Sequence, residues 1–170
     1  MKKMRNQKGF TLVEIAIVLV IVGLLIGGIL KGQEMIKSGK VKRAGKQIED
    51  LRAAITSYQD KYRGIMPGSG VAPATAGATA VFTDLAAAGL LAYDTTAGMV
   101  NPFGGAVTAT NPGGQISIIS NDIPDYAARK IDIALDDATA TTGDITTAAA
   151  YASDDATEDT TPIDLTIVVK

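Results

Sequence analysis

The sequence of 170 residues contains neither cysteine nor histidine. The usual zinc sites, which are built from Cys and His side chains, are therefore excluded. Nucleophiles that a histidine activates, of the Ser-His or Cys-His kind, are excluded for the same reason. Because no disulfide can form, the loops must be held by packing, by hydrogen bonds or by a metal bound through oxygen atoms.

Charge is nearly absent from residues 10–30, where Glu14 is the single ionisable side chain. About 20 apolar residues are enough for a helix to cross a bilayer. A carboxylate within hydrocarbon is costly, so Glu14 needs a specific reason. Four basic residues in positions 1–8, followed by Gly9, precede the run. A secretory signal peptide fits poorly, because its apolar core is only about 7–15 residues long and its cleavage site follows the core.

The order of basic leader, Gly9, Phe10, Thr11, Leu12, Glu14 and apolar run resembles the N-terminus of type IV pilins and of type II secretion pseudopilins. The resemblance covers residues 1 to about 31 and is weak from residue 64 onward. It implies that a prepilin peptidase cleaves between Gly9 and Phe10 and methylates the new amino group of Phe10. It also implies that Glu14 neutralises this amino group on a neighbouring subunit during assembly, which leaves neither charge unmatched in a low dielectric.

Residues 32–63 continue the helical pattern beyond the apolar run. Apolar residues recur every three or four positions from Val41 to Tyr62, which predicts a narrow stripe on one helix face. Gly64 and the Pro67-Gly68 pair predict the end of the helix. Four glycines at 23, 27, 28 and 32 would let helices approach closely in a bilayer, and ordinary transmembrane composition explains them equally well.

The remaining residues, 64–170, predict a small head. Residues 82–91 and 123–135 have helical spacing, the second stretch with Asp122 as its cap. Residues 106–110 and 115–120 read as a hairpin, residues 92–105 as a loop, and residues 162–170 as a final strand. Residues 136–159 are expected to be mostly exposed. The predicted fold class is α+β, with a long N-terminal spine helix, part transmembrane and part amphipathic, packed on a small antiparallel β-sheet head. The predicted divisions are leader 1–9, assembly helix 10–31, amphipathic helix 32–63 and head 64–170.

The two parts of the chain differ in charge. Residues 1–63 hold 13 Lys/Arg and 5 Asp/Glu, a net charge of +8, and residues 64–170 hold 3 and 13, a net charge of −10. We expect no nucleic-acid partner, because the basic part is largely membrane-proximal helix. The basic residues between 31 and 46 could contact acidic head loops on neighbouring subunits, or anionic lipid headgroups.

Two acidic loops are candidates for calcium, which takes six to eight oxygen ligands from carboxylates and carbonyls. Asp136, Asp137 and Asp144 lie around Gly143, and a second cluster spans residues 154–159. Major pseudopilins of type II secretion bind calcium in a C-terminal loop, which is the resemblance behind this idea. The spacing does not fit an EF-hand, and a solvated acidic loop is the commoner explanation. We therefore expect no cofactor, with calcium as the alternative.

Taken with the resemblance, these patterns predict a structural subunit of a type IV pilus rather than an enzyme. No spacing brings paired Asp residues into one pocket, which argues against an anchored hydrolase. A type II secretion pseudopilin shares the whole N-terminus and is the near alternative, and a membrane-anchored adhesion module that does not polymerise is an alternative of another class. Expected partners are identical or related pilin subunits, the prepilin peptidase, the inner membrane and the assembly machinery. The precursor would sit in the inner membrane with its head in the periplasm, before joining an extracellular pilus or a periplasmic pseudopilus.

Overall fold

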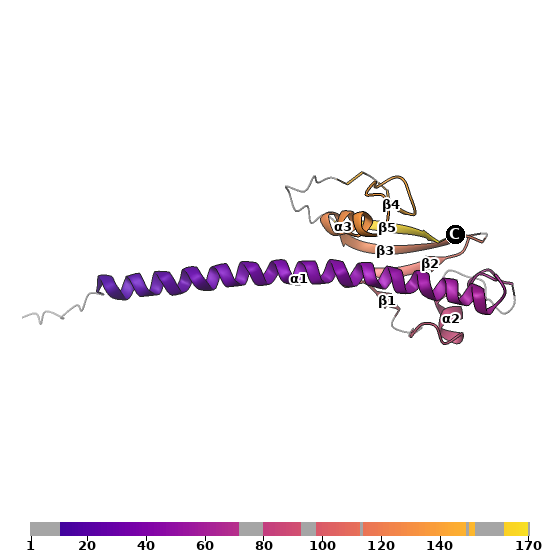
Figure 1. Ribbon diagram of the computed structural model, residues 1–170, viewed down its shortest axis with the longest axis horizontal. Helices are drawn as coiled ribbons and strands as arrows, with labels where there is room; N and C mark the ends of the chain where they lie inside the picture. Colours follow the sequence, from indigo (N-terminus) through magenta and orange to yellow (C-terminus); the bar gives the residue numbers. More distant parts are fainter. Residues whose placement is uncertain are drawn as a thin grey trace, which may run out of the picture. The chain divides into compact units, whose positions relative to one another are not determined.

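The computed structural model describes residues 11–71, 80–92, 98–112, 114–148, 150–151 and 162–169. The chain divides into two compact units, Met1–Gly39 and Lys40–Lys170. Helix α1 (Leu12–Lys61) contributes to both units (Figure 1). In the first unit every side chain from Thr11 to Lys31 is exposed. By length and composition, α1 is long and apolar enough to cross a membrane.

The second unit combines the C-terminal part of α1 with two short helices and a sheet (Figure 1). The helices are α2 (Ala80–Ala87) and α3 (Asp125–Leu135). Within the described residues the sheet has five strands in the order β1-β2-β3-β5-β4, and all its pairings are antiparallel. The strands are β1 (Met99–Val100), β2 (Ala106–Thr110), β3 (Ile116–Pro124), β4 (Ile145–Thr147) and β5 (Pro162–Val169).

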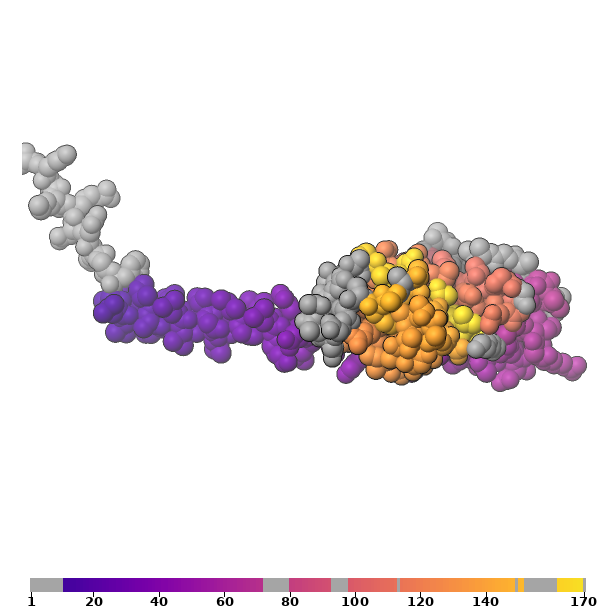
Figure 2. Space-filling view, turned by 90° about the horizontal axis from the view of Figure 1, so that it is seen from above, coloured from indigo at the N-terminus to yellow at the C-terminus, as the bar shows by residue number. Residues whose placement is uncertain are grey.

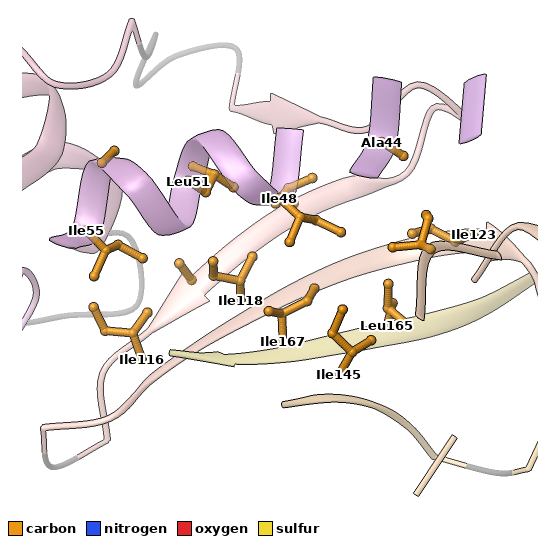
Figure 3. Close-up of a cluster of buried hydrophobic side chains, with 14 of the residues drawn as sticks. Ala44, Ile48, Leu51, Ile55, Ile116, Ile118, Ile123, Ile145, Leu165 and Ile167 are labelled. Carbon is orange, nitrogen blue, oxygen red and sulfur yellow. The ribbon is translucent and has the colours of Figure 1, made fainter. Parts of the chain in front are cut away.

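The core of the second unit lies between α1 and the sheet. The buried residues of α1 are Ala44, Ile48, Leu51, Ala54, Ile55 and Tyr58. Figure 3 shows this face of α1 opposite aliphatic side chains of β3, β4 and β5: Ile116, Ile118, Ile145, Leu165 and Ile167. Full burial of one such side chain contributes about 1.5–3 kcal/mol, so this interface is a major source of the head's stability. The predicted α+β fold is confirmed: a long N-terminal helix packed with a small antiparallel sheet.

Two helix ends show why sequence boundaries are approximate. Helix α1 ends at Lys61, with Arg63 at a φ of 55° and the Gly64 amide donating to the Gln59 carbonyl at 2.7 Å. Helix α2 begins two residues earlier than predicted and ends at Ala87 rather than at residue 91. Gly89, at a φ of 74°, closes it, because the amides of Gly89 and Leu90 donate to the carbonyls of Ala86 and Leu85. This is the Schellman arrangement, which ends a helix at a left-handed residue.

The predicted start of the second head helix, at residue 123 with Asp122 as its cap, is wrong. Ile123 and Pro124 are the end of β3 and pair with Ile163 and Pro162 of β5. The register of this pairing shifts between Ser120 and Ile123, and Asp122 lies within the shift with a φ of 55°. Such a bulge inserts an extra residue that bends the strand, so the local spacing no longer reports the element. Pro124 precedes α3 without a side-chain cap.

Two stretches predicted as loop or exposed coil contain strands. β1 lies within residues 92–105 and pairs with β2. β4 lies within residues 136–159, pairs with β5 and buries Ile145 and Thr147. A strand of two or three residues is too short to show alternation, and its position depends on a partner that is distant in sequence. Residues 152–161, including the second acidic cluster, lie outside the described residues.

Candidate processing and assembly site

The structure describes the site from Thr11 onward, and Gly9 and Phe10 lie outside the described residues. Thr11 and Glu14 form a reciprocal pair of hydrogen bonds at the start of α1. The Glu14 amide donates to the Thr11 hydroxyl at 3.2 Å, and the Thr11 amide donates to Glu14 Oε2 at 2.8 Å. The Thr11 hydroxyl also donates to Glu14 Oε2, at 2.9 Å. This is a capping box, which satisfies backbone amides that the first turn of a helix leaves without partners.

The capping box gives Glu14 a role that the sequence argument missed. The signal was present as Thr11-Leu-Val-Glu14, the threonine-x-x-glutamate pattern that marks a helix start. The hydrogen bonds from the Thr11 amide and hydroxyl hold the Glu14 carboxylate beside the first residues of α1, where the helix dipole also favours negative charge. Glu14 therefore stands four residues from Phe10, with its side chain directed toward the N-terminal end of the helix rather than along the apolar run.

The apolar part of α1 is open on all sides within its own unit. No residue of its most hydrophobic window is buried, and the large side chains from Leu12 to Leu30 are exposed. The space-filling view shows the side chains of this stretch, drawn in indigo, pointing outward along its length (Figure 2). A Cβ atom added at Gly23, Gly27 or Gly28 would meet nothing within 4 Å. The chain's own packing therefore does not require these glycines. Because they lack side chains, another helix can approach the backbone of α1 closely at these positions.

The basic residues that follow the apolar run are partly neutralised within their own helix. Lys31 pairs with Glu34 at 2.8 Å, and Lys46 pairs with Asp50 at 3.0 Å and with Glu49 at 3.6 Å. The hydrogen bond to Asp50 raises the pKa of Lys46. Lys42 and Arg43 are exposed and lie toward the C-terminal end of the basic stretch. A contact between this stretch and acidic surfaces is therefore expected to involve these two cations.

The acidic residues that the sequence singled out are only partly brought together. Asp136 and Asp137 lie with Asp132 in one group, in which one carboxylate oxygen of each residue lies within 4.8 Å of the others. Asp144 does not belong to this group. Asp132 was missed, although it lies four residues before Asp136 at the end of a predicted helix, a spacing that places two side chains on one face. Binding of calcium by these loops stays a prediction.

Comparison with protein families finds a match at the N-terminal end of the chain. Residues 4–30 match the family described as the prokaryotic N-terminal methylation motif, a range that includes Gly9, Phe10 and Glu14. A search of curated proteins finds no match to the chain. The matched range also contains the capping box and nearly all of the exposed apolar stretch of α1. The chain thus carries the prokaryotic N-terminal methylation motif, the prepilin-type N-terminus that type IV pilins and pseudopilins have in common.

Proposed function

We propose that this chain is a structural subunit of a type IV pilus, which polymerises through α1 after a prepilin peptidase cleaves between Gly9 and Phe10 and methylates Phe10. The observation that carries the proposal is the methylation motif at residues 4–30, continuous with a helix whose apolar side chains are uncovered. The precursor lies in the inner membrane with its head in the periplasm. The processed subunit joins an extracellular filament.

The apolar stretch of α1 needs a covering that its own chain does not supply. Lipid covers it before assembly, and neighbouring subunits cover it in the filament. In the membrane, lipid tails cover the side chains between Leu12 and Leu30. In a filament, the same stretch of neighbouring subunits covers them, and the glycines of the stretch allow close helix packing. Either environment removes the apolar surface from water, which is the main driving force for burial.

In this proposal Glu14 determines how far one subunit is shifted along the filament axis relative to its neighbour. Cleavage gives Phe10 a free amino group, and an amino group transferred into the dry interior of a filament needs a counter-charge. The capping box holds the Glu14 carboxylate at the start of α1, where the amino group of an adjacent subunit can reach it. A neighbour in any other register leaves both charges unpaired, so the pair selects one stagger between subunits.

Mass spectrometry of the chain from cells tests the processing step. The mature chain is expected to begin at methylated Phe10, and a Gly9→Val precursor is expected to remain uncut. Gly9 has no side chain, so it can enter a narrow peptidase subsite next to the bond that is cleaved. The branched side chain of valine would not enter such a subsite. Recovery of intact chains beginning at Met1 from assembled material would contradict the proposal.

A second experiment separates charge from capping. Glu14→Gln keeps a capping box, since Gln serves in place of Glu, but removes the charge. Thr11→Ala keeps the charge but removes the cap, at a typical cost of about 1 kcal/mol to the helix end. We expect Glu14→Gln subunits to be processed yet excluded from sheared filaments, and Thr11→Ala subunits to be incorporated. The reverse pattern would show that Glu14 acts through the helix cap alone.

Pseudopilins share the same motif, so the location of the filament decides between the two systems. Detection of this chain in filaments sheared from the cell surface supports the pilus. If deletion of the gene instead abolishes export of a secreted protein while surface filaments stay intact, the chain is a pseudopilin. Processing without any filament would favour the anchored adhesion module.

A further inference from the structure

Helix α3 presents positive charge on a head that is otherwise acidic. Residues 64–170 hold 13 Asp/Glu and 3 Lys/Arg, and two of these three cations, Arg129 and Lys130, are neighbours on α3. The acidic residues within α3, Asp125 and Asp132, are both buried. The charge that this helix exposes is therefore positive, whereas the head as a whole is negative.

An apolar side chain lies beside these cations. The exposed fraction of Ile133 is 55%, and Ala134 is also exposed. Positions 130, 133 and 134 lie on one side of the helix, because residues three and four apart are neighbours. Lys130 Nζ lies 5.7 Å from the centre of the Tyr126 ring, one turn earlier on the same side. We refer to Lys130, Ile133 and Ala134, with the adjoining Arg129, as the α3 face.

The opposite side of α3 packs into the core of the head. Its residues Ala127, Ala128 and Ile131 are buried there. The α3 face is therefore held rigidly on the surface, away from the core. Basic residues next to an exposed aliphatic residue are typical of helices that lie at a membrane surface, where the cations contact anionic headgroups.

The α3 face lies at the end of the second unit that α1 enters. β3 leads directly into α3, and Figure 3 shows Ile123 of β3 at the same end of the core as Ala44, with Ile55 at the other end. The second unit begins at Lys40, so Ala44 marks the end that is nearest in sequence to the apolar run of α1. In a chain anchored by that run, this is the end of the head that is tethered to the membrane.

We propose that the α3 face docks the head of the membrane-anchored subunit onto an anionic lipid surface before assembly. Lys130 and Arg129 contact the lipid phosphates, and Ile133 enters the boundary between headgroups and acyl chains. Each cation at an anionic surface favours the docked head by about fivefold. Contacts of this strength are sufficient, because α1 tethers the head to the same bilayer and makes docking intramolecular.

The strands at this end of the head do not favour the same contact. The exposed acids Asp122 and Asp164 belong to β3 and β5, so α3 is the element that complements an anionic surface. The inference rests on the proposed function only in requiring that α1 anchors the chain in a bilayer. It does not require that the chain forms a filament.

The test measures contact with lipid at single positions of the full chain. Because the sequence has no cysteine, one introduced cysteine can carry a fluorophore at a chosen site. An Ala134→Cys label reports on the α3 face and leaves Ile133 in place. A Val20→Cys label reports on the apolar run, and a Val71→Cys label reports on an exposed position beyond the C-terminal end of α1. The labelled chains are reconstituted at low density in vesicles that contain brominated lipid as quencher, made either of phosphatidylglycerol with phosphatidylethanolamine or of phosphatidylcholine alone.

We expect the label at residue 134 to be quenched in the anionic vesicles only, and the label at residue 71 in neither kind. Salt at 1 M, where the screening length is about 3 Å, should abolish quenching at residue 134 but not at residue 20. Lys130→Glu should lower the ratio of docked to free heads by at least about fivefold. Arg63→Glu is the matched control, because it makes the same charge change at an exposed residue outside the α3 face and should leave the ratio unchanged.

The labels separate failure of docking from failure of anchoring. Quenching at residue 20 without quenching at residue 134 in anionic vesicles would overturn the docking of the head and leave the anchoring by α1 intact. Equal quenching at residue 134 in both kinds of vesicle, or full quenching in Lys130→Glu, would also overturn it. Protection of the label at residue 134 that rises with the number of chains per phosphatidylcholine vesicle would assign the α3 face to a second copy instead. Absence of quenching at residue 20 would contradict the anchoring, and the docking with it.

Discussion

The packing of α1 on the sheet can be tested by shortening one side chain at its centre. Ile55 has an exposed fraction of 0% and lies in the core with Ile116 and Ile118 (Figure 3). Ile55→Ala removes buried aliphatic groups and leaves a cavity, for which cores of this kind lose about 2–5 kcal/mol. Ile55→Val removes one methylene group and should cost about 0.5–1.5 kcal/mol. The two substitutions form a graded series at one site.

The matched control is Ile133→Ala on α3. Ile133 is also a helical isoleucine, but its exposed fraction is 55%. An exposed position of this kind is expected to change stability by no more than about 0.5 kcal/mol. In a chain of this size 1 kcal/mol corresponds to roughly 2–4 °C, so Ile55→Ala should lower the melting temperature by roughly 5–20 °C. Ile133→Ala should leave it nearly unchanged.

The assay is thermal unfolding of the full chain in mild detergent, followed by near-ultraviolet circular dichroism. This signal suits the head, because the rings of Tyr58 and Tyr62 lie 4.4 Å apart on α1 and Tyr58 is buried. The helical signal of the detergent-covered N-terminal stretch does not contribute to it. An unchanged melting temperature for Ile55→Ala, or an equal loss for Ile133→Ala, would refute the packing of α1 described here.

Two further predictions concern a buried turn and the basic stretch. Asn101→Ala should destabilise the head by roughly 2–4 kcal/mol, because four hydrogen bonds are lost. The Asn101 side-chain amide donates to the Ser120 hydroxyl and the Asn121 carbonyl, and its oxygen accepts from two turn amides. Urea unfolding measures the free energy of unfolding, and a loss below about 0.5 kcal/mol would contradict the prediction. Changing Lys42 and Arg43 to Glu should weaken purified filaments at low salt if the basic stretch contacts acidic head surfaces. Unchanged filaments in the absence of lipid would instead favour contact with lipid headgroups.

Features governed by local periodicity were predictable from the sequence. The stripe on α1 follows a spacing of three and four residues, and its central members Ile48, Leu51 and Ile55 are buried as that spacing requires. β5 was predicted from the strict alternation of its apolar residues, and the hairpin of β2 and β3 from the turn residues between them. In each case the pattern extends over at least five residues, so it records which side faces the core.

Features governed by distant contacts were not predictable. β4 has three residues and exists because β5 lies beside it. The bulge at Asp122 converts two residues of an apparent helix into the end of β3. The buried Asp132 likewise accepts a hydrogen bond from Tyr151, which lies 19 residues away in sequence. The capping box of Thr11 and Glu14 differs from these, because its threonine-x-x-glutamate pattern is local and is visible in the sequence.

The central claim is that processed copies of this chain polymerise through α1, with Glu14 of one subunit paired to the Phe10 amino group of another. The most direct measurement is a reconstruction by electron cryomicroscopy of filaments purified from cells that express the chain. The account predicts a filament in which residues 12–30 of neighbouring subunits pack together and each Glu14 carboxylate lies within about 4 Å of a neighbour's methylated amino group. A filament in which Glu14 faces solvent, or a chain that remains a membrane-bound monomer after cleavage, would contradict it.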